Sequence, residues 1–172
     1  AHHRRIQAGI LSWGQDLDHE HNPFQCNLGY QVSLSGKGEW AKKGDYIGKQ
    51  ALEKMKADLK DGHKPYKLQL VGFEIGGKPI DEYAPDFWLV SPGDGGDPCG
   101  FITSPWYHPE KGKNIAMGYI PFDGTLNPNG FPKWELGKKF KVHLPDIYAD
   151  EPGVPVDAVT VDVPFTESFN AN

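Results

Sequence analysis

The residues whose types are best suited to chemistry are the histidines near the start of the chain. His19, Glu20 and His21 provide two imidazoles and a carboxylate, which are ligand types that can converge on one metal ion. A complete site would need a further carboxylate a few residues on, where the chain has Gln25 and Cys26. The later His108 is expected in a Pro-rich loop, so the pattern favours a solvated loop over a metal centre.

Other reactive residues do not complete a catalytic pattern. Ser12, Ser91 and Ser104 stand outside nucleophile-elbow motifs, and the glycines of 93–96 open no helix that could bind phosphate. His2 and His3 are potential ligands, but a tag remnant or a frayed terminus is the simpler reading. We therefore expect no self-contained active site.

Composition and cysteine content narrow the class of protein. A formal net charge of -5 without a basic stripe argues against nucleic acid or an anionic membrane as partner. Cys26 and Cys99 lie far apart in unlike contexts, which predicts reduced, buried thiols and a cytoplasmic location. We find no apolar run of membrane-spanning length and no signal peptide. The chain opens at Ala1 without Met, so we expect that it starts at a cut.

The elements that must position these residues begin with the stretch from Arg5 to Asp18. Ile6, Ile10 and Trp13 recur at i, i+4 and i+7, and Gly14 follows where a left-handed cap would lie. This predicts a short helix ending near Gly14. The polar run 15–22, closed by Pro23, is predicted to be a loop.

Two further elements are predicted before residue 63. Between Asn22 and Lys43, the alternation around Leu28, Tyr30, Val32 and Leu34 predicts one strand. From Gly48 to Lys60 a helical apolar face predicts a helix, with Gly62 as its stop.

After Pro65 the sequence breaks into short β-branched or aromatic segments separated by Gly, Pro and Asp. The six predicted strands are Tyr66 to Ile75, Phe87 to Val90, Cys99 to Thr103, Asn114 to Ile120, Lys138 to Leu144 and Val154 to Phe165. Without helical patterns between them, they suggest a small barrel or sandwich. The fold class is thus α+β, mainly β, and the boundary between the N-terminal part and the β-rich part is at 62–64.

Eight motifs, taken in order, resemble the glycine cleavage T-protein (aminomethyltransferase) family, which includes folate-dependent demethylases. They are Arg5-Ile6-Gln7-Ala8-Gly9-Ile10, Trp13-Gly14-Gln15-Asp16-Leu17-Asp18, Asn22-Pro23-Phe24, Leu28-Gly29-Tyr30, Asp45 to Leu52, Leu70-Val71-Gly72, Gly100 to Ser104 and Gly112 to Tyr119. Each motif is weak by itself, but their common order is specific and covers nearly the whole chain.

The resemblance implies that only the C-terminal half of such a protein is present. Residues 1–63 would be the last part of the folate-binding domain, and residues 64–172 the C-terminal antiparallel β-barrel. The family's catalytic Asp lies in the N-terminal half, so the implied partners are that half, in the same protein or a partner chain, and a small-molecule methyl donor. The implied cofactor is tetrahydrofolate.

The resemblance also implies folate-binding residues. The family usually has Glu at the position of Gln7, where the carboxylate binds the pterin ring; an amide can accept one hydrogen bond there but brings NH2 donors of its own. Trp13 and Tyr30 occupy two aromatic positions of the family and are expected to pack beside a flat ring. Core packing is the alternative for both aromatic residues.

Two departures from the aminomethyltransferases resemble the demethylase-like branch. Asp81 stands where a basic residue is common, which argues for a methyl donor other than the lipoyl-linked glycine intermediate. Bulky residues, among them Trp106, replace the small ones usual in the segment 104–109, and we expect Trp106 to contact the folate.

Two classes of function follow. The chain is either the C-terminal portion of a tetrahydrofolate-dependent methyl or aminomethyl transferase, or a β-barrel that binds or interacts without chemistry of its own. A third possibility is the folate domain of a dimethylglycine- or sarcosine-oxidising enzyme.

Overall fold

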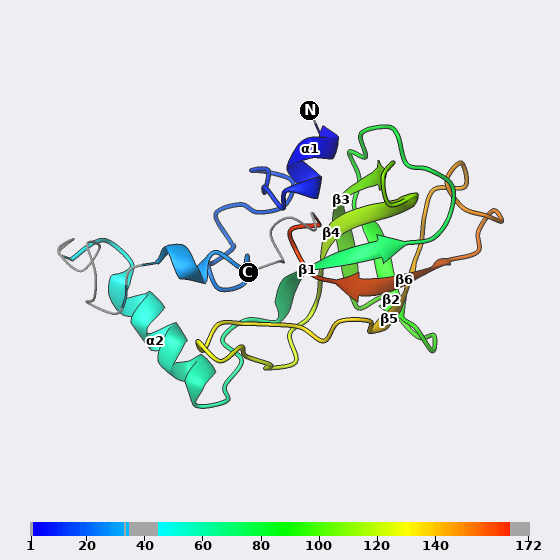
Figure 1. Cartoon of the computed structure of the whole chain (residues 1–172). Coiled ribbons are helices and arrows are strands. Elements are labelled where there is room, and N and C mark those ends of the chain that lie inside the picture. Colours follow the sequence, from blue (N-terminus) through cyan, green and yellow to red (C-terminus); the bar gives the residue numbers. More distant parts are fainter. Residues whose placement is uncertain (1, 33, 35–44, 166–172) are drawn as a thin grey trace.

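The protein is built around a closed barrel of six antiparallel strands, seen in a computed structural model that describes residues 2–32, 34 and 45–165 (Figure 1). The strands follow one another around the barrel in the order β1-β4-β3-β2-β5-β6. Their bounds are Leu68–Ile75 (β1), Trp88–Pro92 (β2), Gly100–His108 (β3), Lys113–Pro121 (β4), Lys139–Val142 (β5) and Val156–Val161 (β6). The six predicted strands and the mainly β fold are therefore confirmed.

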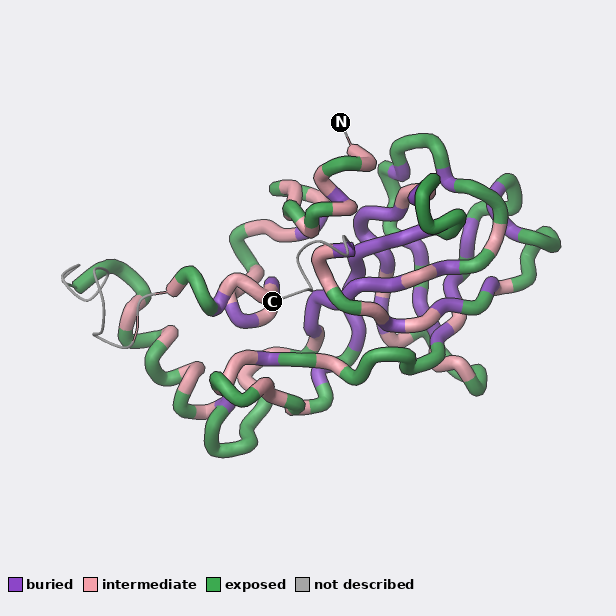
Figure 2. Tube along the Cα trace, in the orientation of Figure 1, coloured by how far each residue is buried: buried purple, intermediate pink, exposed green. Residues whose placement is uncertain are grey.

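The barrel wall is buried on both faces where the N-terminal segment covers it. In β1, Val71 and Phe73 belong to the barrel core, whereas Leu70 belongs to a second apolar cluster on the outside. The second cluster also contains Ile6 and Phe165, from segments at the two ends of the chain. Figure 2 shows the buried residues concentrated in the barrel. Successive residues of a strand face opposite sides of the sheet. Because both sides are buried here, the sequences of β1 and β4 are nearly continuous apolar runs.

Strand β3 extends to His108, so the expectation that His108 lies in a Pro-rich loop is wrong. The register of β3 against β4 shifts between Ile102 and Ser104, which indicates a bulge at Thr103. Beyond Ile102 the strand pairs with β4 but no longer with β2. Proline has no amide hydrogen to donate to a neighbouring strand. Pro105 is tolerated because this part of β3 is unpaired on the side of β2.

The first helix, α1, runs from His2–Gln7 and ends sooner than predicted. Gly9 has φ +67°, and the amides of Gly9 and Ile10 donate to the carbonyls of Ile6 and Arg5. These two bonds form a Schellman motif, so the chain turns away from α1 at Gly9 and not at Gly14. Ile10 and Trp13 consequently lie outside the helix and are exposed. The expectation of a frayed terminus is also wrong, because His2 and His3 belong to α1.

The strand predicted from Asn22 is wrong over its described part. Residues 23–27 form turns, and Gly29–Gln31 is a short 3-10 helix, η1. Asn27 adopts φ 60° and its side-chain amide donates to the Leu70 carbonyl at 2.9 Å. This local bonding competes with an extended ladder. The remainder of the predicted strand, residues 33 and 35–43, lies outside the described residues.

The second helix, α2, runs from Lys49–Lys60, as predicted, and lies outside the barrel (Figure 1). Its stop at Gly62 is confirmed by a second Schellman motif, in which the amides of Gly62 and His63 donate to Leu59 and Asp58. Leu59 packs with Phe24 and Phe122 in a third apolar cluster. None of the described helices is long and apolar enough to cross a bilayer.

Candidate functional site

A buried ion pair fixes the N-terminal segment to the barrel. Arg5, in α1, donates from Nη1 to Asp16 Oδ2 at 2.8 Å, and Asp16 is only 1% exposed. The other carboxylate oxygen, Oδ1, accepts from the hydroxyls of Thr103 at 2.5 Å and Ser104 at 2.6 Å on β3. The amide of Ser12 adds a 2.8 Å bond to Oδ2. With this many donors the charge is compensated, so the group can remain buried.

Neighbouring residues extend this attachment. Gln15 accepts from Arg5 Nη2 at 3.1 Å and donates to the Thr103 carbonyl, which the bulge makes available, at 2.7 Å. Tyr119, on β4, donates to the Asp16 carbonyl at 2.6 Å and lies 3.4 Å from the Cys26 thiol. Burial raises the pKa of both Tyr119 and Cys26 above their ordinary values. Both groups are therefore neutral supports at pH 7.

Beside this attachment lies a cleft of about 560 Å³. It lies between the turn after α1, the region around η1, the connection from β4 to β5 and the segment after β6. Its walls are mostly apolar or aromatic, and its polar lining residues include Asn127, Asn129, Lys133 and Asp162. A volume of this size with apolar walls and a few polar groups is typical of small-molecule sites.

The structure separates the three residues of the predicted folate face. Tyr30 lines the cleft and is 70% exposed, while Gln7 is half-buried and precedes two cleft residues, Ala8 and Gly9. Trp13 is 69% exposed and does not line the cleft. Core packing, the alternative for Trp13 and Tyr30, is wrong for both. Their contact with folate stays a prediction.

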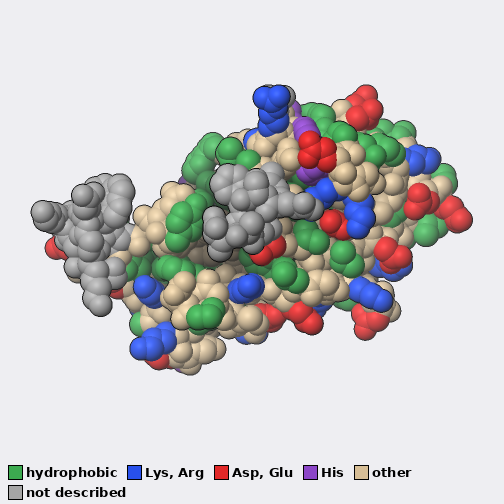
Figure 3. Space-filling view, in the orientation of Figure 1, with side chains coloured by type: hydrophobic (Ala, Val, Ile, Leu, Met, Phe, Trp, Pro, Cys, Tyr) green, Lys and Arg blue, Asp and Glu red, His purple; other side chains and the backbone are tan. Residues whose placement is uncertain are grey.

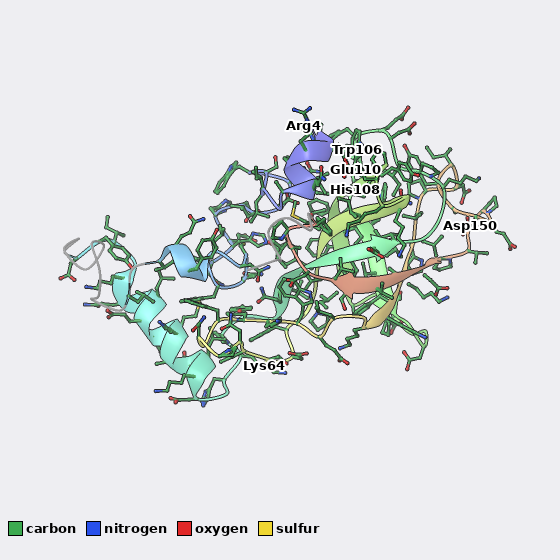
Figure 4. All side chains as sticks on the ribbon, in the orientation of Figure 1. Arg4, Lys64, Trp106, His108, Glu110 and Asp150 are labelled. Carbon is green, nitrogen blue, oxygen red and sulfur yellow. The ribbon has the colours of Figure 1, made fainter. Side chains whose placement is uncertain are left out.

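Trp106 lies on β3 beside α1, away from the cleft, together with His108 (Figure 4). The Trp106 ring stacks on His2 at a centroid distance of 6.0 Å, and the buried His108 meets His3 edge-on at 5.4 Å. These contacts hold α1 against the end of β3. The assignment of Trp106 to folate also stays a prediction.

The potential metal ligands do not come together. His21 pairs with Asp18 at 2.8 Å, and the Glu20 amide donates to the same carboxylate oxygen. The Glu20 amide, followed by the His21 ring, lowers the pKa of Asp18. In the described part of the chain, no three His, Cys, Asp or Glu side chains form a group that could hold a metal ion.

The serines and cysteines make contacts that support the fold. Ser91 is buried and lies 2.9 Å from Nε2 of His143, and among the described residues no carboxylate bonds to that imidazole. Ser104 is engaged with Asp16 and Arg5. Both cysteines are free thiols, Cys26 buried and Cys99 partly exposed.

Sequence reasoning missed the part of the cleft formed by the connection between β4 and β5. This segment contributes Phe131, Lys133 and Trp134 and is held by a bridge between Leu126 and Pro132. The turn sequence Asn127-Pro128-Asn129-Gly130 between aromatic residues was the available signal. It indicated a loop, but not which face of the barrel the loop would cover.

Comparison with known proteins places the chain in a wider group. An aminomethyltransferase of Synechocystis sp. is 32% identical over 117 residues, which are 68% of this chain and 27% of that protein. An aminomethyltransferase of Thermosynechococcus vestitus is 29% identical over 162 residues, 94% of this chain and 35% of that protein. No profile of a known protein family matches the chain.

A solved structure has the same fold. The glycine cleavage system aminomethyltransferase T of Bartonella henselae superposes on 95% of this chain with a TM-score of 0.64 at 20% identity, using 37% of its own length. The chain thus spans about a third or less of the curated relatives it matches. From the matched relatives and the shared barrel, we conclude that the chain belongs to the glycine cleavage T-protein family and corresponds to its C-terminal part.

Proposed function

We propose that the chain is the C-terminal part of a folate-dependent one-carbon transferase. Residues 1–63 would complete a larger folate-binding domain, and residues 64–172 would form the family's terminal barrel domain. The remaining parts would come from the N-terminal half of the same protein or from a partner chain. The observation that carries the proposal is the 32% identity to an aminomethyltransferase over two thirds of this chain.

The cleft offers a place where part of a folate would fit. Tetrahydrofolate has a flat pterin, an aryl ring and a glutamate tail, and the cleft combines aromatic walls with amides and one amine. Tyr30 would contact the ligand at the cleft, and Gln7 would accept a hydrogen bond from the pterin near the turn after α1. Trp13 and Trp106 would border the ligand from surfaces that the missing part of the protein would face.

Tetrahydrofolate, when bound, would supply the acceptor nitrogen for the one-carbon unit. The residues of this chain would hold the acceptor in a fixed orientation and exclude water from it, because correct placement of two reactants supplies much of the rate in such transfers. The Arg5–Asp16 attachment would keep α1 and the following turn in one position against β3. The chain contributes positioning, and the missing half would contribute the catalytic carboxylate.

We further propose a methyl donor of the demethylase-like type. The exposed Asp81 replaces a basic residue that would suit a different donor, and Trp106 adds bulk beside α1. Both differences would change what the complete protein accepts without changing the folate side of the reaction.

The direct test uses the longest natural protein that contains this chain. That protein is expected to transfer a one-carbon unit to tetrahydrofolate from a methylated donor, followed by mass spectrometry of the folate product. The isolated 172 residues are expected to give no product above buffer. Product formation by the isolated chain, or folate-independent turnover by the longer protein, would contradict the proposal and favour another function for the barrel.

Variants of the longer protein test the folate contacts. Gln7→Ala is expected to leave the free energy of unfolding within about 0.5 kcal/mol, because Gln7 is half-exposed and lies in no apolar cluster. It should weaken tetrahydrofolate binding by roughly 0.5 to 1.5 kcal/mol, the value of one neutral hydrogen bond. Titration calorimetry measures the affinity. An unchanged affinity in a folded variant would remove Gln7 from the site.

A further inference from the structure

The start of α1 is attached to the barrel through aromatic rings. The His2 ring stacks on Trp106 at a centroid distance of 6.0 Å and lies 5.0 Å from the Tyr83 ring. The His3 ring meets His108 edge-on, with centroids 5.4 Å apart and planes at 88°. Imidazoles thus make both of these attachments, and an imidazole changes its charge near neutral pH.

The end of α1 is attached by different chemistry. Arg5 bonds to Asp16 and to the Ser104 hydroxyl at 2.8 Å each, and Ile6 is buried in the second apolar cluster. These contacts involve no imidazole. A change of charge at the histidines can therefore act on the start of α1 while its end stays in place.

The contact between His3 and His108 leaves polar atoms without partners. The Nε2 atoms of both rings are buried and have no hydrogen-bond partner among the described residues. His108 is only 2% exposed, and its Nδ1 faces the Lys111 amide at 3.4 Å. A protonated His108 would carry a hydrogen on each nitrogen, but Nδ1 faces a donor and Nε2 has no acceptor. The closed contact therefore disfavours a charged ring.

The groups nearest to His108 act in both directions on its charge. Burial is the main cause that lowers the pKa of His108, and the His3 ring and Lys111 add to the effect. Glu110 and a hydrogen bond to the backbone of His108 itself oppose it. Because the net pKa lies below its ordinary value of 6.5, acid favours a state in which His108 has left this contact.

Charges on the other elements around the contact give His108 no acceptor. Lys113 of β4 stands opposite His108 in the register, and its ammonium group pairs with Glu74 of β1 at 2.6 Å. Arg4 is exposed on the outer side of α1 (Figure 4). A proton on His108 would thus add a positive charge beside basic groups of α1, of β4 and of the turn between β3 and β4.

We propose that the contact between His3 and His108 is an acid-operated latch, in which proton uptake releases the start of α1 from β3 while the end of α1 stays attached. Release returns both imidazoles to water, where their nitrogens find partners. It also uncovers the face of Trp106 on which His2 stacks in the closed form. The latch goes beyond the proposed function and depends on neither the reaction nor its ligand.

The test is amide hydrogen exchange of the 172-residue chain, followed residue by residue by NMR between pH 7.5 and 5.5. The amides of Ile6 and Gln7 bond back to the start of α1, so their protection factors report its release. These factors should fall about three- to tenfold, since one coupled proton changes an equilibrium by at most about tenfold per pH unit. Protection of Met117, a β4 residue of the same apolar cluster as Ile6, should stay constant.

Three variants identify the group that takes up the proton. His108→Phe should abolish the fall in protection, whereas His63→Phe, at an exposed position, is the control and should retain it. His3→Phe should reduce the fall, because one cause that lowers the pKa of His108 is then absent. His2 and His3 remain in His108→Phe, so this variant separates the latch from a direct effect of their charges on α1.

Three results would overturn the proposal. The first is protection of Ile6 and Gln7 that does not change with pH in the wild-type chain. The second is a fall of the wild-type size in either His108→Phe or His3→Phe, so the test remains decisive if one of these variants does not fold. The third is a parallel fall at Met117, which would show that acid opens the barrel as a whole.

Discussion

Asp16 is the residue on which the N-terminal segment depends. Its carboxylate receives bonds from a guanidinium, two hydroxyls and an amide, and three of these donors come from outside its own turn. Replacing one partner of such a buried pair leaves the other desolvated without compensation, and this cost exceeds the net contribution of the intact pair.

Asp16→Asn should therefore lower the free energy of unfolding by roughly 3 to 5 kcal/mol, because Arg5 loses its counter-charge and an amide cannot accept from every donor. Urea unfolding monitored by circular dichroism measures the change. Asp18→Asn, two residues on and only partly buried, is the control and should cost less than about 1 kcal/mol. Similar losses of unfolding free energy in the two variants would show that the buried pair stabilises the protein no more than the contacts of Asp18 do.

At the scale of elements, the end of α1 determines where the polar turn meets the barrel. Two glycines at positive φ follow the helix, but they have different surroundings. A Cβ on Gly9 would lie 2.5 Å from a methyl carbon of Val163, whereas a Cβ on Gly14 would have no neighbour within 4 Å. The two positions therefore separate backbone strain from crowding.

Gly14→Ala should cost about 1 to 2 kcal/mol, which is the penalty for a left-handed residue with a Cβ. Gly9→Ala should cost that amount and roughly 1 to 3 kcal/mol more, because Val163 must move. Thermal unfolding of both variants gives the difference. Equal costs would mean that the turn does not pack against Val163.

His108 links α1 to the end of β3 through a buried contact. Burial, and then the neighbouring His3, lower its pKa below the ordinary value of 6.5; Glu110 opposes the shift and Lys111 adds to it. As the pH falls below 6.5, the unfolded chain takes up a proton at this position before the folded chain does. Proton uptake then favours unfolding.

The free energy of unfolding should consequently decrease below pH 6.5, by at most about 1.4 kcal/mol per pH unit from this group. His108→Phe should reduce the slope, while His63→Phe, at an exposed position, should leave it unchanged. Urea midpoints at pH 7.5 and 5.5 measure the slopes. The same slope in all three proteins would exclude His108 as a source of acid sensitivity.

The strands were predictable and the N-terminal turns were not, for a physical reason. In the barrel, local period and tertiary burial agree, as in the alternation of Phe140 and Val142 with lysines in β5. Around Tyr30 the same alternation occurs without a partner strand, because Asn27 bonds to β1 and turns the chain. In β3, Pro105 suggested a loop, but only the pairing of neighbouring strands decides whether a proline is tolerated.

The candidate site shows the same limit. Tyr30 was identified from its place in a motif, and it does line the cleft. Lys133 and Trp134 were not identified, because they approach Tyr30 only through the path of the connection between β4 and β5. Side chains that lie about a hundred positions apart in the chain meet through topology, which no local pattern encodes.

At the scale of the whole molecule, the barrel and the N-terminal segment share an apolar cluster. Ile6 of α1 packs with Leu70, Met117 and Tyr119 of the barrel wall, and Phe165 joins them from beyond β6. The space-filling view shows charged side chains spread over the visible face, with no large single-sign area (Figure 3). The N-terminal segment therefore acts as a cover for one side of the barrel.

A piece comprising residues 64–172 should expose this cluster and lose stability relative to the whole chain. We expect it to bind a hydrophobic dye such as ANS and to unfold at lower urea concentration. Adding a peptide of residues 1–34 should reduce dye binding. A midpoint equal to that of the 172-residue chain would mean that the barrel needs no cover.

Closure of the barrel has one more consequence. In an open sheet, the outermost strands present unpaired amides and carbonyls to which another chain can add. Here β1 is joined to β6, so each described strand has a neighbour on both sides, and only parts of strands, such as β3 beyond Ile102, are paired on one side alone. Strand exchange between copies requires hydrogen bonds within the barrel to break first. Closure of the barrel is therefore expected to oppose fibril formation.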